Sequence, residues 1–300
     1  MTRQLLFLSD VRYGGWVTFT YHLAMILGKP MVLRPANSFR GGGVFYDALS
    51  YKNVAASALR QLPKPIVTAV SPNKRHILKD LQSGYLVVHD PTEFCEELFE
   101  YAKRSKTFVI RHKVQKALAA KGIESTLLRH PFYQYAKAPA GKRVNRAMSR
   151  VDWDKHTDLI LRANALGADV NIHGQVNNQY FFHGKLEELD FKRWHRGAYG
   201  RTLKESSQLY GTTRHLVDMS VIKGDGGGTQ YTFLDAEYHG AGLILNRGWT
   251  EVEGSLYQDG VNCYAVSTPE ELCDALQRPP LVAQLLPTQE MNQYWKKAMQ

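Results

Sequence analysis

The chain has 300 residues, which is too long for one small domain and fits two α/β lobes. Its hydrophobic content of 44% is ordinary for a globular protein, and no stretch reaches the roughly 18–20 consecutive apolar residues of a membrane span, so the composition excludes a spanning helix. The formal net charge of +10, from 38 Lys and Arg against 28 Asp and Glu, predicts a polyanionic partner, either nucleic acid or the phosphates of a nucleotide ligand.

The N-terminus and the cysteines favour a reducing compartment. The apolar run at residues 5–8 is too short for a signal peptide and has no small-residue cleavage site after it. An odd number of cysteines without a signal favours free thiols, and Cys95, Cys263 and Cys273 show no CxxC or metal-ligand spacing. His173 and His183 show none either. We therefore expect a cytoplasmic protein without a structural metal.

The first half of the chain alternates short apolar runs with helical patterns. An amphipathic helix is predicted at Val17–Leu27. The predicted strands are Leu5–Ser9, Met31–Arg34, Pro65–Val70, Tyr85–His89, Thr107–Arg111 and Ser125–His130. Strands that alternate with helices at this spacing predict right-handed βαβ units and a parallel sheet. Ligands bind outside the carboxyl ends of such strands, so we look for chemistry in the turns after Ser9, Val70 and His89.

Residues 132–144 contain Pro, Gly and small residues without a periodic apolar face, which predicts an interdomain linker. The strands predicted after it are Val144–Ser149, Val170–His173, Leu216–Ile222, Leu243–Asn246 and Cys263–Val266. The predicted helices are Asp154–Ala165, Tyr231–His239, Pro269–Leu276 and Thr288–Met299. We expect an N-terminal lobe at residues 1–135, a C-terminal lobe at 144–285 and a terminal helix at 286–300. The fold class is α/β, with two Rossmann-like lobes and a cleft between them.

Two glycine-rich turns lie more than two hundred residues apart. The glycines are Gly14 and Gly15 after the first predicted strand, and Gly226, Gly227 and Gly228 before the helix predicted at residues 231–239. Glycine lets the backbone approach a ligand and take positive φ, and a helix that begins beside it offers free N–H groups to a phosphate. One such turn in each half predicts a two-lobed enzyme with a nucleotide-linked substrate.

The second turn continues into Thr229 and Gln230, so consecutive N–H groups could form an anion nest. Asp235 or Glu237, one turn into the predicted helix, could accept hydrogen bonds from both hydroxyls of a ribose. The alternative is a surface loop before a helix whose acids face water. The run lacks the lysine of a GxxxxGK[ST] loop, so an ATPase is not indicated.

Two further groups lie at predicted strand ends. Arg150 leaves a strand and Lys155 lies in the first turn of the next predicted helix, so the two cations could clamp a diphosphate. The alternative is a solvated strand end whose cations pair with nearby aspartates, and such pairs are common and weak. His89 and Asp90 end another strand and could orient or deprotonate an acceptor hydroxyl. The alternative there is a simple turn before Pro91.

A basic and aromatic stretch covers residues 191–201. Its cations and indole could grip phosphates and stack on bases: Lys192, Arg193, Trp194, Arg196 and Arg201. A solvated basic helix face is an equally weighted alternative.

Together these motifs resemble the GT-B family of glycosyltransferases, whose second lobe carries S-R-x(n)-K and later an E-A-x-x-x-G helix. The matching residues are Ser149-Arg150…Lys155 and Leu234-Asp235-Ala236-Glu237…Gly240, together with the glycine turn after the first strand. Val88-His89-Asp90, Ser149–Lys155 and Tyr231–Asp235 are most similar to the α-glucosyltransferases of phage DNA, which modify hydroxymethylcytosine. The resemblance extends over nearly the whole chain.

The resemblance implies a role for each motif. Arg150 and Lys155 would contact the donor diphosphate, Asp235 would hold the donor ribose, and the amides of residues 226–230 would face phosphate or sugar hydroxyls. Gly14 and Gly15 would let the first loop close over the donor, and His89 and Asp90 would lie near the reacting sugar. Two departures leave the identity of the sugar open: Asp235 replaces the usual Glu, and Gly227 stands where related transferases often have a second Glu.

The sequence therefore predicts a nucleotide-sugar-dependent hexosyltransferase. We expect transfer from a UDP-sugar, of which UDP-glucose is the first choice, to a hydroxymethylated pyrimidine in bacteriophage DNA, in the cytoplasm of an infected host. The resemblance implies retention at the anomeric carbon, and the role of a divalent metal stays open. One alternative keeps the fold and changes the acceptor to a glycan, lipid or small molecule. A lower alternative is a nucleic-acid-binding protein without enzymatic activity.

Overall fold

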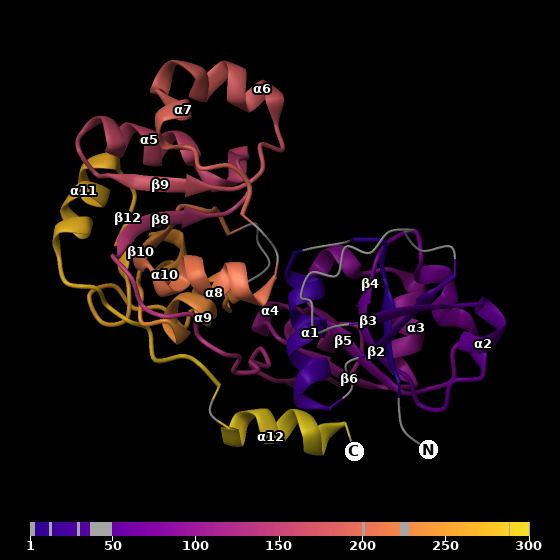
Figure 1. Cartoon of the computed structure of the whole chain (residues 1–300). Helices are drawn as coiled ribbons and strands as arrows, with labels where there is room; N and C mark the ends of the chain where they lie inside the picture. Colours follow the sequence, from indigo (N-terminus) through magenta and orange to yellow (C-terminus); the bar gives the residue numbers. More distant parts are fainter. Residues whose placement is uncertain are drawn as a thin grey trace. The chain divides into compact units, whose positions relative to one another are not determined.

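The structure is a computed structural model that describes residues 4–11, 14–28, 31–36, 50–199, 202–222, 228–287 and 289–299. The chain divides into two compact units, drawn in Figure 1 with many of their helices and strands labelled. Unit 1 comprises residues 1–134 and 287–300, and unit 2 comprises residues 135–286.

In the described part of unit 1, seven parallel strands form one sheet in the order β3-β2-β1-β4-β5-β6-β7. The strands are β1 (Leu5–Leu8), β2 (Met31–Pro35), β3 (Ser50–Val54), β4 (Ile66–Val70), β5 (Tyr85–Val88), β6 (Lys106–Val109) and β7 (Thr126–Leu127). The helices are α1 (Gly15–Ile26), α2 (Ala56–Arg60), η1 (Arg75–Asp80), η2 (Pro91–Glu93), α3 (Glu96–Lys103), α4 (His112–Ala119) and α12 (Gln289–Ala298). The central strands β1, β4 and β5 are buried along their whole length, as expected for a parallel sheet covered on both faces.

Helix α12 packs on unit 1, although it lies more than 150 residues after the rest of that unit. The buried side chain of Trp295 lies against Phe19 and Phe108, at ring-centroid distances of 5.5 and 5.7 Å. Its indole Nε1 donates a hydrogen bond to the carbonyl oxygen of Arg129 at 2.9 Å. The Asn292 amide exchanges hydrogen bonds with the backbone N–H and C=O of Phe132. These contacts make α12 part of the core of unit 1.

In the described part of unit 2, five parallel strands form a second sheet in the order β12-β11-β10-β8-β9. The strands are β8 (Val144–Met148), β9 (Val170–His173), β10 (Thr213–Asp218), β11 (Gly242–Asn246) and β12 (Tyr264–Val266). The helices are η3 (Trp153–Lys155), α5 (Thr157–Ala165), α6 (Gln179–Phe181), η4 (Phe182–Leu186), η5 (Glu187–Leu189), α7 (Phe191–Trp194), α8 (Leu203–Gly211), α9 (Tyr231–Tyr238), α10 (Gly248–Glu251) and α11 (Pro269–Gln277).

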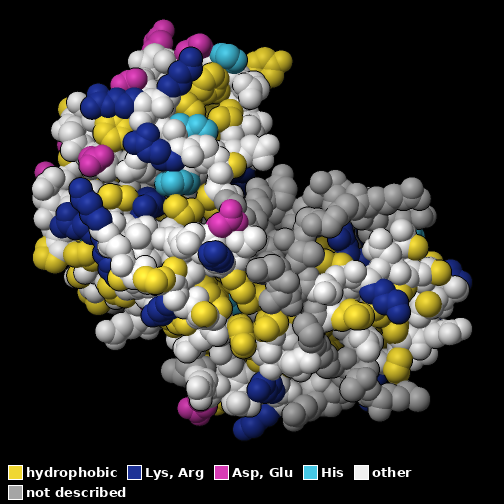
Figure 2. Space-filling model, in the orientation of Figure 1, with side chains coloured by type: hydrophobic (Ala, Val, Ile, Leu, Met, Phe, Trp, Pro, Cys, Tyr) yellow, Lys and Arg dark blue, Asp and Glu magenta, His cyan; other side chains and the backbone are white. Residues whose placement is uncertain are grey.

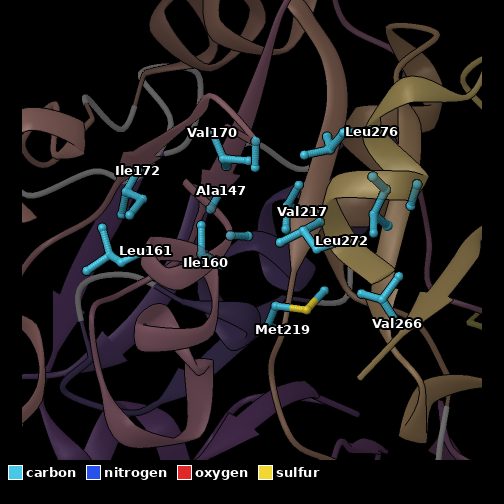
Figure 3. Packing of buried hydrophobic residues seen from close by; sticks show 14 of the residues in the cluster. Ala147, Ile160, Leu161, Val170, Ile172, Val217, Met219, Val266, Leu272 and Leu276 are labelled. Atoms are coloured by element: carbon cyan, nitrogen blue, oxygen red, sulfur yellow. The ribbon is translucent and has the colours of Figure 1, made fainter. Parts of the chain in front are cut away.

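Hydrophobic clusters lie on both faces of this second sheet. Figure 3 shows one of them, in which side chains of α5 and α11 pack on those of β8, β9, β10 and β12. The opposite face is covered by α8, α9 and α10, whose Tyr210, Phe233 and Trp249 pack on Leu216 and Leu243. Both units are therefore α/β sandwiches of parallel strands between helices, and the predicted fold class is confirmed in this respect.

The structure corrects several predicted elements. The strand predicted at Leu216–Ile222 is β10, which begins at Thr213 and ends at Asp218. Of the strand predicted at Ser125–His130, only Thr126–Leu127 form a strand, β7. The helix predicted at Asp154–Ala165 is divided, because His156 takes a left-handed conformation with φ 43° between η3 and α5. Lys155 therefore belongs to η3 and not to the first turn of the following helix.

Gly174 follows β9 and is packed directly against the end of β8. A Cβ atom at this position would overlap the carbonyl oxygen of Ser149 and lie 2.7 Å from its carbonyl carbon. We expect Gly174→Ala to lower the free energy of unfolding by about 1–3 kcal/mol, since backbone atoms cannot yield as a flexible side chain can. Urea unfolding followed by circular dichroism measures the effect. Gly184→Ala is the matched control, because its Cβ would meet no atom within 4 Å, and equal stabilities of the two variants would refute the clash.

Candidate functional site

The carboxyl end of β8 leads into the turn that carries Arg150 and Lys155. Asp152 caps η3, with its Oδ1 accepting a hydrogen bond from the Trp153 N–H at 2.9 Å. The guanidinium of Arg150 pairs with Asp152 at 3.1 Å and with Asp154 at 2.6 Å. These are the aspartate pairs of the alternative interpretation, yet the Arg150 side chain stays 41% exposed, so an anion can still reach it.

This turn lies beside the segment that leads to the second glycine run. The backbone N–H of Val221, after β10, donates to the carbonyl oxygen of Asp154 at 2.9 Å. This hydrogen bond joins the chain at Arg150–Lys155 to the chain that runs on toward α9. Two segments that are about 70 residues apart in the sequence meet at the carboxyl edge of one parallel sheet, where ligands of α/β proteins bind.

The described residues before α9 have the geometry of a constrained helix start. Gly228 has a φ of +91°, which favours glycine, and Gln230 is the N-cap residue of the helix. The Thr229 hydroxyl is buried and hydrogen-bonded to the Tyr257 hydroxyl at 2.5 Å. The first N–H groups of a helix have no partners within the helix, so this end can receive an anion. Gly226 and Gly227 lie outside the described residues.

Asp235 is buried inside unit 2, at 4% exposure. Its Oδ1 accepts a hydrogen bond from the Tyr135 hydroxyl at 2.6 Å, and the Tyr238 hydroxyl donates to the Tyr135 carbonyl oxygen at 2.6 Å. Burial raises the pKa of Asp235 to about 7, although the hydrogen bond from Tyr135 lowers it. Tyr135 is the first residue of unit 2, so this carboxyl group anchors the chain where it enters the unit.

Glu237, on the same helix, anchors the chain where it leaves the unit. Its Oε1 accepts hydrogen bonds from the backbone N–H groups of Leu285 and Leu286 at 2.7 and 2.8 Å. Burial raises the pKa of Glu237, and these two N–H donors lower it. The carboxyl groups of α9 therefore hold the chain at both ends of unit 2, at Tyr135 and at Leu285–Leu286. The sequence did not indicate this role for Glu237 or for Tyr135.

In unit 1, His89 and Asp90 follow β5 at the carboxyl edge of the sheet. The His89 Nε2 donates to the carbonyl oxygen of Thr68 at 2.7 Å, and the ring meets Phe19 edge-on at 4.6 Å. Burial lowers the pKa of His89 to about 4, so the imidazole is neutral at neutral pH. Asp90 is half-buried and caps η2, with its Oδ1 accepting from the Thr92 N–H at 2.9 Å and from the Thr92 hydroxyl.

Two neighbours of this pair were missed from the sequence. Glu93 is buried and accepts hydrogen bonds from the backbone of His89 and Asp90, and Arg111 lies close enough to influence both carboxyl groups. The signal for Glu93 was present, because Asp90 and Glu93 have the spacing of a capping box. Nothing in the local sequence marks Arg111, which follows the next strand along the sheet, β6, as the N-cap residue of α4.

The first glycine turn is described from Gly14 onward. Gly14 is the N-cap of α1 and has a φ of +103°, so a side chain there would be strained. Gly15 is the first residue of α1, and a Cβ atom there would meet no atom within 4 Å. The N-terminus of α1 thus lies at the carboxyl edge of the sheet of unit 1, directly after β1.

Comparison of the fold with solved structures gives clear matches. The structure of HepE from Anabaena in complex with UDP-glucose superimposes with a TM-score of 0.71 at 14% identity, over 99% of each chain. An α-glucosyltransferase in complex with UDP and a 13-mer DNA containing an HMU base matches with a TM-score of 0.64 at 11% identity, over 99% of this chain and 93% of that one. The pneumococcal O-GlcNAc transferase GtfA, in complex with UDP and GlcNAc, matches with a TM-score of 0.53 at 12% identity, over 75% and 58%.

The chain has the GT-B glycosyltransferase fold. The expected resemblance is therefore confirmed at the level of the fold. No protein-family model matches the sequence, and no curated protein matches it either. The similarity to GT-B structures thus lies in the arrangement of strands and helices, because only 11–14% of the aligned residues are identical.

In this GT-B chain, the predicted nucleic-acid contacts lie on α7 and just after it. Lys192 and Arg193 are exposed, and the Arg193 guanidinium lies over the Trp194 ring at 5.0 Å. Trp194 packs against the hydrophobic cluster of Figure 3, and the Arg196 Nε donates to Asn171 Oδ1 at 2.6 Å. Figure 2 shows basic, acidic and histidine side chains interspersed on the face of unit 2 that carries α6 and α7. Arg201 lies outside the described residues.

The described residues hold neither a set of metal ligands nor a helix that could cross a membrane. No three or more His, Cys, Asp or Glu side chains lie together as a set that could hold a metal ion. None of the described helices combines the length and the apolar character needed to cross a membrane.

Proposed function

We propose that the protein is a glycosyltransferase that moves a sugar, with glucose as the first choice, from a UDP-sugar to a hydroxymethylated pyrimidine base in phage DNA. The observation that carries the proposal is the Val221–Asp154 hydrogen bond in unit 2. It joins the turn that bears Arg150 and Lys155 to the chain that leads toward the glycine run of α9. A diphosphate at this edge would meet two cations and a helix N-terminus. The GT-B fold shared with structures that hold UDP or UDP-glucose supports the same donor.

In the proposed reaction the bond between the anomeric carbon and the diphosphate oxygen breaks, and a bond to the hydroxymethyl oxygen forms. Arg150, Lys155 and the amides of Gly228, Thr229 and Gln230 stabilise the negative charge on the departing UDP. Asp90, with His89 beside it, is assigned to the acceptor hydroxyl and its proton. We expect retention of the anomeric configuration, and extrusion of the target base from the duplex before transfer.

The DNA acceptor is supported by the match to the α-glucosyltransferase crystallised with DNA and by the net charge of +10. The test is a screen of UDP-sugars against hydroxymethylated and unmodified DNA, with the product identified by mass. We expect a mass increase of one hexose on hydroxymethylated DNA alone. Failure with every DNA substrate, together with hydrolysis of a UDP-sugar, would overturn the DNA acceptor but not the donor.

A different acceptor is the second candidate, because the structures that match this fold include an O-GlcNAc transferase, GtfA, in complex with UDP and GlcNAc. Salt separates the two candidates. The affinity for a DNA acceptor should fall steeply as salt is added, because binding releases counterions from the phosphates, whereas the affinity for a neutral glycan should change little. A non-enzymatic nucleic-acid-binding protein would turn over no UDP-sugar at all.

Asp235→Asn tests the assignment of the donor ribose. If Asp235 accepts hydrogen bonds from the ribose, the substitution should raise the dissociation constant of UDP more than it lowers turnover, because the amide of Asn accepts at one atom only. Calorimetric titration with UDP measures this. Tyr135→Phe is the control, since it removes only the hydroxyl that donates to Asp235. Equal weakening by both variants would mean that Asp235 acts by anchoring Tyr135 and not by binding ribose.

A further inference from the structure

A single buried carboxyl group joins the ends of two strands in unit 1. Glu93 is 4% exposed and lies in η2, three residues after Asp90. Its Oε1 accepts a hydrogen bond from the N–H of Val70, at the end of β4, at 3.4 Å. Its Oε2 accepts from the N–H of His89 and from the N–H of Asp90, the latter at 3.3 Å. Three backbone donors of adjacent strands therefore converge on one side chain.

Glu93 bridges β4 and β5 where the pairing between these two strands has ended. The register of β4 with β5 pairs Ile66 with Tyr85 and Val67 with Leu86, whereas the three donors lie beyond these pairs. Buried N–H groups need an acceptor, and the Glu93 carboxyl group supplies one to each of the three. An ionised carboxylate has two oxygens and can accept all three bonds at once. The position of the turn at residues 89–90 is thus set by the Glu93 side chain.

The two residues held in this way are the ones assigned to the acceptor hydroxyl. The backbone N–H groups of His89 and Asp90 are bound by Glu93, while the Asp90 side chain is oriented by the N–H and hydroxyl of Thr92. The His89 ring is held separately, by the carbonyl oxygen of Thr68. If Glu93 released its three donors, Asp90 would keep its local cap but lose its fixed place at the sheet edge.

We propose that Glu93 is a positioning residue for sugar transfer, which holds the backbone of His89 and Asp90 at the ends of β4 and β5 and so sets where the Asp90 carboxylate meets the acceptor. The proposal rests on the function proposed above. Glu93 itself touches neither substrate nor reacting atoms in this scheme. Its contribution is the geometry of the turn, and a displacement of about 1 Å in such a group can cost about a hundredfold in rate.

The charges around Glu93 supply a second readout. Burial raises the pKa of Glu93 to about 8, and the neighbouring Asp90 carboxylate also raises it, whereas the N–H donors lower it. Among the described residues, the guanidinium of Arg111 and the neutral ring of His89 also face this cluster, and buried His130 lies close to both. The ionised carboxylate accepts from all three N–H groups, whereas the acid form presents a hydroxyl in place of one acceptor. The turnover number should therefore rise as the pH rises through this range.

The test compares Glu93→Gln with Glu96→Gln, an exposed glutamate three residues further on that serves as the matched control. Gln puts an NH₂ group against an N–H donor, so we expect the turnover number to fall at least tenfold in Glu93→Gln, with the KM for the UDP-sugar unchanged. The titration in the wild-type pH profile should also disappear, since an amide does not titrate. If Glu93→Gln does not fold, Glu93→Asp takes its place. This variant keeps a titrating carboxyl group, so we expect a lower turnover number that still rises with pH.

Hydrogen exchange of the amides at residues 89 and 90 tests the positioning without any activity. We expect exchange about tenfold faster in Glu93→Gln than in Glu96→Gln, because the buried N–H groups lose their acceptor. Wild-type turnover and pH profile in Glu93→Gln, or unchanged exchange, would overturn the proposal. A wild-type enzyme that transfers no sugar would instead refute the proposed function and with it the catalytic consequence, while the exchange result would still decide whether Glu93 holds the turn.

Discussion

Replacing Arg150 or Lys155 by alanine is expected to lower the turnover of sugar transfer at least tenfold and to leave unit 2 folded. Each side chain would donate to the charge that develops on the departing diphosphate, and the loss of one such donor costs on the order of 2–4 kcal/mol of transition-state stabilisation. Steady-state rates with saturating UDP-sugar measure the loss, because the effect lies in turnover more than in binding.

The surroundings of the two cations refine this expectation. Arg150 is paired with Asp152 and Asp154, and exposed pairs of this kind contribute about 0–1 kcal/mol, so their loss should barely change stability. Arg60→Ala is the matched control, since Arg60 is also an exposed arginine paired with an aspartate, Asp80, and lies outside the proposed site. Wild-type rates in both Arg150→Ala and Lys155→Ala would reject the diphosphate clamp.

Trp295→Ala is expected to give the largest loss of stability among the substitutions considered. The side chain is 2% exposed, packs on Phe19 and Phe108, and donates a hydrogen bond to the carbonyl oxygen of Arg129. Truncating a buried aromatic to alanine typically lowers the free energy of unfolding by about 3–5 kcal/mol, because a cavity replaces the ring. The carbonyl of Arg129 also loses its donor.

Urea unfolding of the full chain measures the effect, and the transition of unit 1 should move to lower urea while that of unit 2 stays in place. Tyr294→Ala is the control, because the neighbouring side chain is 53% exposed and should change stability by about 0.5 kcal/mol or less. A midpoint for Trp295→Ala equal to that of Tyr294→Ala would show that α12 is not needed by the core of unit 1.

Much of the fold could be predicted from the sequence, because buried parallel strands are nearly continuous apolar runs and these are local signals. Leu5–Leu8, Ile66–Val70 and Tyr85–Val88 were recognised in this way, and all three are buried along their length. Strand β3, Ser50–Val54, was missed because it is a polar, largely exposed edge strand, held by backbone pairing with β2. Helix α8 was missed although Thr202 and Glu205 form a capping box at its start.

The candidate site, too, could be predicted only in part. Arg150, Lys155, His89, Asp90 and the glycine turns follow or precede apolar runs, so their place at the carboxyl ends of parallel strands follows from the order of elements along the chain. The sequence by itself thus determined the fold class and the edge of each sheet where chemistry is expected.

Only the tertiary structure decided which side chains meet there. Asp235 bonds to Tyr135, a hundred residues earlier, Glu93 joins the ends of β4 and β5, and Trp295 closes the core of unit 1 from the far end of the chain. The physical reason is range: the periodicity of a strand or helix depends on neighbouring residues, whereas the partner of a buried carboxyl or indole depends on how distant segments pack together.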